Sequence, residues 1–116
     1  MKLTAELVGQ TGELEAALYF SRQGCTITWP RSARNPGYDF IAELNGHMTK
    51  VQVKAGNSYE NTSKSPVVSC NIDPKKCDVV YVAHIGTNQR RLYPAKSCPV
   101  KVTFPKTTGH QFDVKL

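Results

Sequence analysis

The dipeptide Asn45-Gly46 constrains this chain more than any other feature of its sequence. It separates two runs of β-compatible residues, 38–44 and 47–53. Asn-Gly is the preferred pair for the centre of a type I′ turn, in which both residues have positive φ. The sequence therefore predicts a β-hairpin in which Leu44 lies opposite His47 and Asp39 lies opposite Gln52.

This register predicts which side chains share a face of the hairpin, because side chains alternate between faces along a strand. Asp39 lies on the same face as Gln52 and Lys54. The opposite face is apolar and holds Tyr38, Phe40, Ala42, Leu44, Val51 and Val53. Directly facing Cβ atoms are roughly 4.5–5.5 Å apart and diagonal ones about 7–8 Å apart. Asp39, Gln52 and Lys54 can therefore converge on one small ligand.

The chemistry of these three side chains suits a metal-assisted reaction. Asp39 and Gln52 offer oxygen atoms of the type that Mg²⁺ accepts, and Lys54 offers a movable ammonium group. Such a set suits hydrolysis of a phosphodiester, in which negative charge grows on the phosphoryl oxygens. The alternative is a solvent-exposed hairpin face on which Asp39 and Lys54 form a weak surface ion pair.

A helix is expected before the hairpin, over residues 7–23. Its apolar residues recur at helical spacing: Leu7, Leu14, Ala17, Leu18 and Phe20. Its firmest part is predicted to begin near Thr11, which can cap the first turn, and to end at Gly24.

The helix carries acidic residues that are candidates for the same site. Glu13 and Glu15 are about 200° apart around a helix, so we expect only one of them to point at the sheet. Glu13 lies beside the stripe of Ala17 and Phe20 and is the favoured candidate. Glu6, seven residues earlier and on nearly the same face, is the alternative.

The remaining pattern indicates a helix followed by strands, which predicts an α+β or mixed three-layer fold. Further strands are expected at residues 25–29, 67–70, 77–83, 91–93 and 100–104, with a polar loop at 55–66, a turn at 86–90 and a polar tail at the end. The length of 116 residues fits a single domain, 1–116.

Composition narrows the class of protein. Apolar residues make up 40% and charged residues 21%, which is a globular balance, and no apolar run approaches the roughly 20 residues that span a bilayer. The first residues lack the apolar core of a signal peptide, so we expect a cytoplasmic protein with its four cysteines as thiols and no membrane partner.

The net charge of +6 lies in the second half of the chain, where residues 61–116 hold nine basic and three acidic residues. Such a surplus favours either a polyanion partner or simple solubility. Arg31 and Arg34 precede the hairpin and Lys64 follows it, so these three are the best candidates for contacts with DNA phosphates.

The spacing of these residues resembles a known superfamily. Tyr38-Asp39, followed after twelve residues by Gln52-Val53-Lys54, and preceded by Gly12-Glu13 in a helix closed by Gly24, resembles the PD-(D/E)XK nucleases. The similarity is greatest to the small intron-encoded homing endonucleases, whose middle motif is QxK. Archaeal Holliday-junction resolvases are also similar. The resemblance covers roughly residues 6–60.

The resemblance implies an α/β (mixed α+β) fold with a restriction-endonuclease-like core, a mixed β-sheet flanked by helices. It also implies roles for residues. Asp39 is the central metal ligand, Gln52 replaces the usual acidic ligand, and the carbonyl of Val53 is a further ligand. Lys54 orients or deprotonates the attacking water, and Glu13 completes the metal site. The implied metal is Mg²⁺, for which Mn²⁺ substitutes.

Two positions depart from the family pattern. Gly37 stands where many members carry proline, and the neutral Gln52 removes one negative charge, which leaves the number of bound metals open.

The expected function is that of a Mg²⁺-dependent endonuclease, similar to homing endonucleases, which hydrolyses double-stranded or branched DNA. Cutting both strands takes two active sites, so a homodimer or homotetramer is expected. The alternatives are a structure-specific nuclease such as a junction resolvase, and a catalytically silent nucleic-acid-binding module of the same fold.

Overall fold

The computed structural model of the protein describes residues 3–31, 37–59, 65–106 and 111–116. This part of the chain folds into helix α1 (Ala5–Arg22), a short 3₁₀ helix η1 (Ala95–Ser97) and strands in two sheets. The strands are β1 (Thr26–Thr28), β2 (Phe40–Leu44), β3 (His47–Gly56), β4 (Ser58–Tyr59), β5 (Pro66–Ser69), β6 (Val79–His84), β7 (Gln89–Pro94), β8 (Lys101–Thr103) and β9 (Gln111–Val114).

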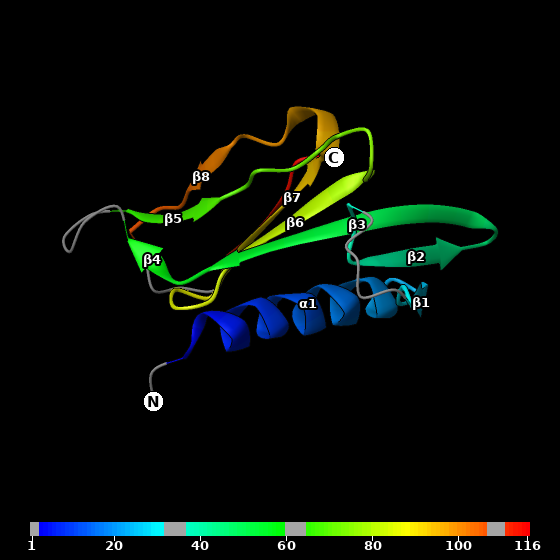
Figure 1. The fold of residues 1–116 in the computed structure, drawn as a ribbon, viewed down its shortest axis with the longest axis horizontal. Helices are drawn as coiled ribbons and strands as arrows, with labels where there is room; N and C mark the ends of the chain where they lie inside the picture. Colours follow the sequence, from blue (N-terminus) through cyan, green and yellow to red (C-terminus); the bar gives the residue numbers. More distant parts are fainter. Residues whose placement is uncertain (1–2, 32–36, 60–64, 107–110) are drawn as a thin grey trace.

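The elements form three layers, with α1 on one face of the large sheet and the small sheet on the other (Figure 1). The large sheet has the order β1-β2-β3-β6-β7-β9 and is mixed, because β3 pairs with β6 and β7 pairs with β9 in parallel. The small sheet has the order β4-β5-β8. The mixed three-layer fold is as predicted. The resemblance implied a mixed sheet flanked by helices; in the described residues α1 covers one face of the large sheet and the small sheet covers the other.

The predicted hairpin is confirmed. Asn45 and Gly46 both have positive φ, 52° and 83°, as a type I′ turn requires. Five pairs then follow in the expected register, from Leu44 opposite His47 to Phe40 opposite Val51.

Helix α1 packs on the large sheet and approaches it closely at a glycine. Its buried residues are Val8, Gly12, Ala16 and Phe20. A Cβ atom at Gly12 would lie 2.6 Å from the Cβ of Ala55 on β3, so only glycine permits this close approach. The predicted apolar stripe was therefore wrong in part: Phe20 is buried, but Leu7, Leu14 and Leu18 are 41%, 58% and 50% exposed.

The ends of α1 also differ from the prediction in part. The helix begins two turns earlier than Thr11, because the hydroxyl of Thr4 accepts a hydrogen bond from the backbone N–H of Leu7 and caps the first turn. Its other end is as predicted, since Gly24 has a φ of +94°.

The sheet has a separate apolar core on each face. Ala16 and Phe20 of α1 pack on Phe40, Val51 and Tyr81. Val80 and Val82 of β6 face the small sheet and pack with Val68, Val102 and Phe104. Every residue of β6 is buried because both faces of this strand are covered.

Three predictions for the chain after the hairpin were wrong in part, and residues 60–64 of the predicted loop lie outside the described residues. Residues expected in the loop 55–66 form the end of β3 and strand β4, and the polar tail contains β9, which pairs with β7. Arg90 lies inside β7 rather than in a turn. Within the described residues, no helix is long and apolar enough to cross a membrane.

Candidate active site

The register of the hairpin changes at Asp39. The backbone N–H of Asp39 donates to the carbonyl oxygen of Val51 at 2.7 Å, although Val51 is already the ladder partner of Phe40. Two consecutive residues of one strand therefore oppose one residue of the other, which is the arrangement of a β-bulge. Asp39 is therefore not a regular facing partner of Gln52, as the hairpin register predicted. The side chain that precedes Asp39 lies on the opposite face of the sheet from the one predicted.

Tyr38 confirms this change of face. The prediction placed it with Val51 and Val53 on the face that α1 covers. Instead Tyr38 packs against the core on the small-sheet side, with the ammonium of Lys50 5.6 Å from the centre of its ring.

The bulge directs the Asp39 carboxylate at the edge of β3. Its Oδ2 atom accepts a hydrogen bond from the backbone N–H of Val53 at 2.6 Å. The same oxygen accepts a bond from the side-chain amide of Gln52 at 3.1 Å. The predicted convergence of Asp39 and Gln52 is thus present, although a bulge and not a regular facing pair produces it.

Gln52 is nearly buried, with 6% of its surface exposed, so this end of the hairpin is not the solvent face of the alternative interpretation. Its Nε2 atom also lies 3.4 Å from the carbonyl oxygen of Val53. Both neighbours are acceptors, so the nitrogen and not the oxygen of the amide points at Asp39. A ligand role for the Gln52 oxygen requires the amide to rotate.

The electrostatics of Asp39 reflect competing effects. Burial raises the pKa of Asp39 above its usual value, while the hydrogen bond from Val53 and the positive charge of Lys54 lower it; burial is the largest effect. Lys54 is half-buried on β3, two residues after Gln52. Its charge thus acts on Asp39, as the predicted cluster requires.

Glu13 is the helix acid that lies near this carboxylate. Burial raises the pKa of Glu13, and the negative charge of Asp39 raises it further. Glu6, the alternative, is exposed in the first turn of α1.

Glu15 also points at the sheet, which contradicts the prediction that only one of these acids could do so. Its Oε1 atom forms an ion pair with the buried guanidinium of Arg90 on β7. At 100° per residue, Glu13 and Glu15 each lie roughly 80° from the middle of the buried face, on opposite sides of the helix. The two acids therefore reach different parts of the sheet.

Few side chains near Asp39 can bind a metal ion. Among the residues that the structure describes, no three His, Cys, Asp or Glu side chains form a cluster that could hold a metal ion. The donors available near Asp39 are its own carboxylate, that of Glu13, the Gln52 amide and the Val53 carbonyl. All are hard oxygen donors of the kind that Mg²⁺ and Mn²⁺ accept.

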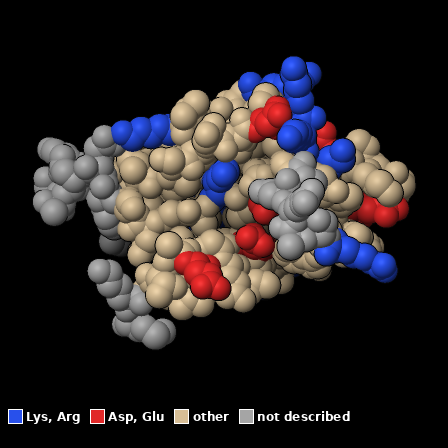
Figure 2. Space-filling model, in the orientation of Figure 1, with Lys and Arg blue, Asp and Glu red and all other residues tan. Residues whose placement is uncertain are grey.

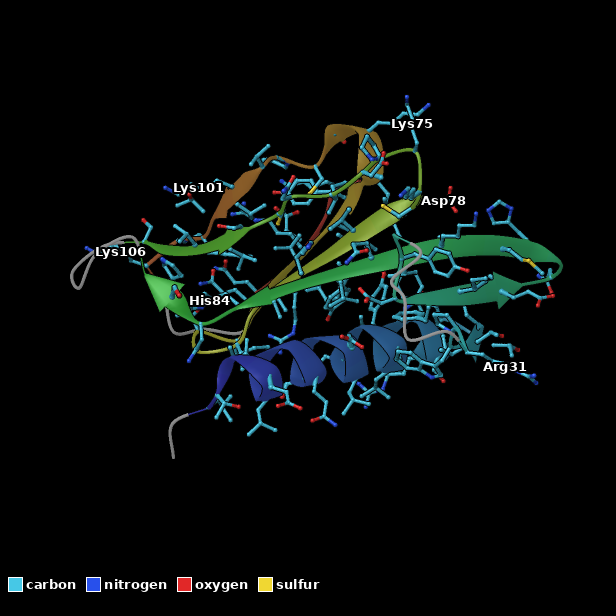
Figure 3. All side chains as sticks on the ribbon, in the orientation of Figure 1. Arg31, Lys75, Asp78, His84, Lys101 and Lys106 are labelled. Carbon is cyan, nitrogen blue, oxygen red and sulfur yellow. The ribbon has the colours of Figure 1, made fainter. Side chains whose placement is uncertain are left out.

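Of the predicted DNA-contacting residues, Arg31 is exposed, while Arg34 and Lys64 lie outside the described residues. Arg31 lies at the lower right of Figure 3 and Lys75 at its upper edge beside Asp78, whereas Lys101 and Lys106 lie on the left of the view. The space-filling view shows Lys and Arg side chains gathered at the end where Lys75 lies (Figure 2).

The sequence did not single out Lys75 and Lys76 as neighbours of the site. A Cβ atom on Gly37, two residues before Asp39, would lie 2.4 Å from the Cβ of Lys76. The turn that carries both lysines therefore packs on the chain that enters the site. No local signal reveals this, because the contact joins residues that are far apart in the sequence.

Comparison with known proteins places this geometry in a family. A model of the PD-(D/E)XK endonuclease family matches residues 3–92. No curated protein sequence matches the chain. The solved structure of a bacterial homing endonuclease, I-Ssp6803I, is similar with a TM-score of 0.75 and 20% sequence identity, over 91% of this chain and 78% of that chain.

The structural similarity shows a shared fold, which confirms the predicted restriction-endonuclease-like architecture. The family match spans most of the 116 residues, including Glu13, Asp39, Gln52 and Lys54. The chain therefore belongs to the PD-(D/E)XK endonuclease family of nucleases.

Proposed function

We propose that this protein is a Mg²⁺-dependent endonuclease that hydrolyses phosphodiester bonds in double-stranded or branched DNA, in the manner of a homing endonuclease. The observation that carries the proposal is the contact of the Asp39 carboxylate with both Gln52 and the N–H of Val53, beside Lys54 and Glu13. These residue types and this spacing are the ones that the family pattern associates with its reaction.

The donor set fits a divalent cation. Asp39 and Glu13 are two carboxylates whose pKa values are raised by burial, so a cation between them would stabilise their ionised forms. Asp39, Glu13, the Val53 carbonyl and a rotated Gln52 amide would hold the ion. When bound, it would lower the pKa of a coordinated water and offset the charge that grows on the phosphoryl oxygens.

Lys54 has the complementary role. Its ammonium acts on the charge of Asp39, so it lies where it can orient the attacking water or stabilise the phosphoryl oxygens. The hydrogen bond from the Val53 N–H holds the Asp39 carboxylate and does not depend on the Gln52 amide, so the carboxylate needs little reorganisation before the reaction.

The substrate is proposed to contact exposed basic residues around the site. Arg31, Lys75 and Lys76 are exposed and can bind phosphates without reading the bases. Arg34 and Lys64 stay in the proposal as residues that precede and follow the hairpin in the sequence.

The active form is proposed to be a homodimer or homotetramer. One chain carries one such site, whereas cutting both strands of a duplex takes two, and symmetry supplies the second without a longer sequence. Sedimentation of the protein with and without DNA measures this state.

The test compares cleavage by the wild type with cleavage by Asp39→Ala and Lys54→Ala, on supercoiled plasmid and on synthetic four-way junctions, across Mg²⁺, Mn²⁺ and EDTA. We expect each variant to cut at least about 10²-fold more slowly, the loss typical of one preorganised charged group. DNA binding in EDTA should be largely retained.

Asp113→Ala and Lys96→Ala are matched controls, because both residues are exposed and lie outside the proposed site. They should cut as the wild type does. Cutting of the junction but not the plasmid would assign the protein to structure-specific nucleases. Absence of metal-dependent cutting on every substrate would leave a silent DNA-binding module and sink the enzymatic proposal.

A further inference from the structure

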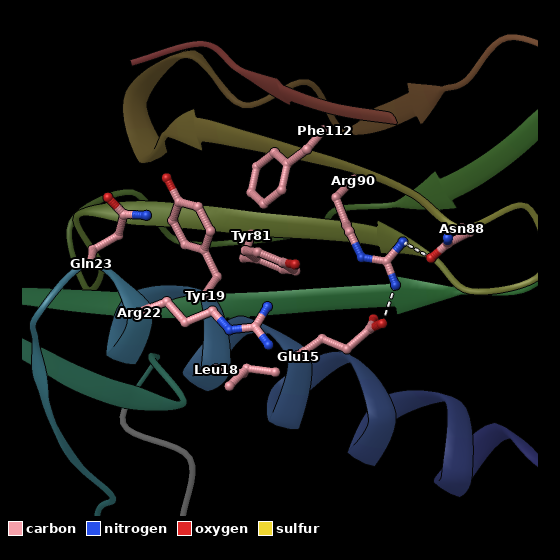
Figure 4. A pocket seen from close by; sticks show the side chains of 9 residues that line it. All are labelled: Glu15, Leu18, Tyr19, Arg22, Gln23, Tyr81, Asn88, Arg90 and Phe112. Carbon is pink, nitrogen blue, oxygen red and sulfur yellow. Dashed lines mark hydrogen bonds and ion pairs between the residues drawn. The ribbon is translucent and has the colours of Figure 1, made fainter. Parts of the chain in front are cut away.

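A cavity lies between α1 and the far edge of the large sheet, on the side of the helix opposite Glu13. Its volume is about 280 Å³, close to the lower limit for pockets that hold small ligands. The nine residues that line it come from α1 and the residue after it, from β6, β7 and β9, and from the turn between β6 and β7 (Figure 4): Glu15, Leu18, Tyr19, Arg22, Gln23, Tyr81, Asn88, Arg90 and Phe112. The nuclease site uses none of them.

The wall of this cavity is aromatic. The rings of Tyr19 and Phe112 lie 4.7 Å apart between centres, and the ring of Tyr81 lies 6.1 Å and 5.5 Å from them. Tyr81 is buried, whereas Tyr19 and Phe112 are only partly covered. Both rings line the cavity, so another flat ring placed in it can pack against them.

The polar groups leave one net positive charge at the opening. Arg90 is 6% exposed and is satisfied by Glu15 and by the Asn88 side chain, to which it donates at 2.6 Å. The carboxylate of Glu15 is thereby neutralised. Arg22 is exposed at the end of α1 and also lines the cavity, so its guanidinium is available to an anionic group.

A flat ring joined to an anion matches this combination. We propose that the cavity binds one unpaired nucleotide, with its base stacked on Tyr19 and Phe112 and its phosphate against Arg22. The proposal rests on the DNA-directed function proposed above, which makes a nucleotide the relevant ligand of this chemistry. Aromatic platforms beside basic residues are the general means by which proteins hold single-stranded DNA.

The nucleotide can belong to an unpaired stretch of a DNA strand or be free in solution. Anisotropy of a labelled 12-nucleotide single strand and of a blunt duplex, both in EDTA, gives the two affinities. Competition by deoxyadenosine monophosphate reports on the free nucleotide. The assay needs no metal and no cleavage, so it stands or falls independently of the nuclease activity.

Two variants address the ring and the charge separately. Phe112→Leu removes a stacking face and should weaken single-strand binding about 5- to 100-fold, the range seen when one base loses its aromatic partner. Arg22 is exposed, so Arg22→Gln should not affect folding. It should also weaken single-strand binding severalfold. Both should leave duplex binding within about twofold, so the ratio of single-strand to duplex affinity falls.

Lys96→Gln is the matched control, because Lys96 is exposed outside the cavity and outside the proposed nuclease site. It should leave that ratio unchanged. Competition by the monophosphate as strong as by the single strand supports the cavity and assigns it to free nucleotides. An unchanged ratio in both Arg22→Gln and Phe112→Leu overturns the proposal, as does binding of neither single strand nor monophosphate.

Discussion

The carboxylate of Asp39 takes the position of a backbone acceptor beside Val53: its Oδ2 atom accepts from the Val53 N–H at 2.6 Å, where β2 leaves β3. Asp78 does the same on the other side of this strand, since its Oδ2 accepts from the N–H of Lys50 at 2.8 Å. Two aspartates thus close the ladders on both sides of β3. Of these two aspartates, Asp39 also accepts a hydrogen bond from Gln52 and interacts electrostatically with Lys54 and Glu13.

This arrangement distinguishes the two candidate helix acids. Glu13→Gln should weaken Mg²⁺ binding and lower the cleavage rate by at least about tenfold, a loss typical of removing a group that supports a metal site. Glu6→Gln should change both by less than twofold, because Glu6 is exposed. The Mg²⁺ dependence of plasmid cleavage measures the difference. Equal losses in the two variants, or a larger loss at Glu6, would contradict the assignment of Glu13.

Gln52→Glu tests the ligand role of Gln52. The substitution puts a second negative charge about where the amide now donates to Asp39, at 3.1 Å. Without metal the two carboxylates repel each other, so the variant should unfold at a lower temperature in EDTA. With Mn²⁺ the added charge should tighten binding severalfold and raise the melting temperature by more than in the wild type. Weaker Mn²⁺ binding by calorimetry would count against Gln52 as a ligand.

The raised pKa values of Asp39 and Glu13 give the fold a pH dependence of known sign. The folded state holds these protons more tightly than the unfolded state, whose pKa values are near 3.8 and 4.5. Their stabilising contribution is complete below those values and is lost as the pH rises through the folded pKa values. Above that range the ionised acids are a cost to the fold.

Asp39→Asn should therefore be more stable than the wild type at pH 7.5 without metal, and the difference should shrink as the pH falls toward 3.8. Urea unfolding at both pH values measures it. Asp113→Asn, an exposed position on β9, is the control and should show no such trend. If Asp39→Asn were less stable than the wild type at pH 7.5 and equally stable near pH 4, the result would contradict a raised pKa of Asp39 in the folded state.

The parts of the fold that follow from local chemistry were predictable. Asn45 and Gly46 determine the hairpin and its first five pairs, and Gly24 ends the helix, because each requires a backbone conformation that few residues adopt. The motif spacing correctly indicated the family. The motif spacing also predicted correctly that Asp39 and Gln52 lie close together. The hairpin register did not predict the β-bulge, because no residue near Asp39 marks it as the bulged position.

Contacts between distant segments were not predictable in this way. The leucines of α1 suggested an inward face, but the close approach at Gly12 turned the small residues inward instead. The burial of Arg90 could not be predicted, because its partner, Glu15, lies 75 residues away in the sequence. Strand β9 forms because β7 offers it an edge, and its own four residues carry little signal.

Gly12 joins the packing of α1 to the geometry of the site, and the same substitution at two glycines separates these effects. Gly12→Ala puts a Cβ atom 2.6 Å from that of Ala55, so it should destabilise the protein by about 1–3 kcal/mol. Gly9→Ala has no atom within 4 Å and should stabilise it by up to about 1 kcal/mol, the helix-propensity gain. Urea unfolding gives both values.

Because Glu13 follows Gly12, the shift of α1 away from β3 should also slow cleavage under conditions in which Gly12→Ala is fully folded. Cleavage at the wild-type rate by folded Gly12→Ala would show that the distance of α1 from β3 does not matter to the site.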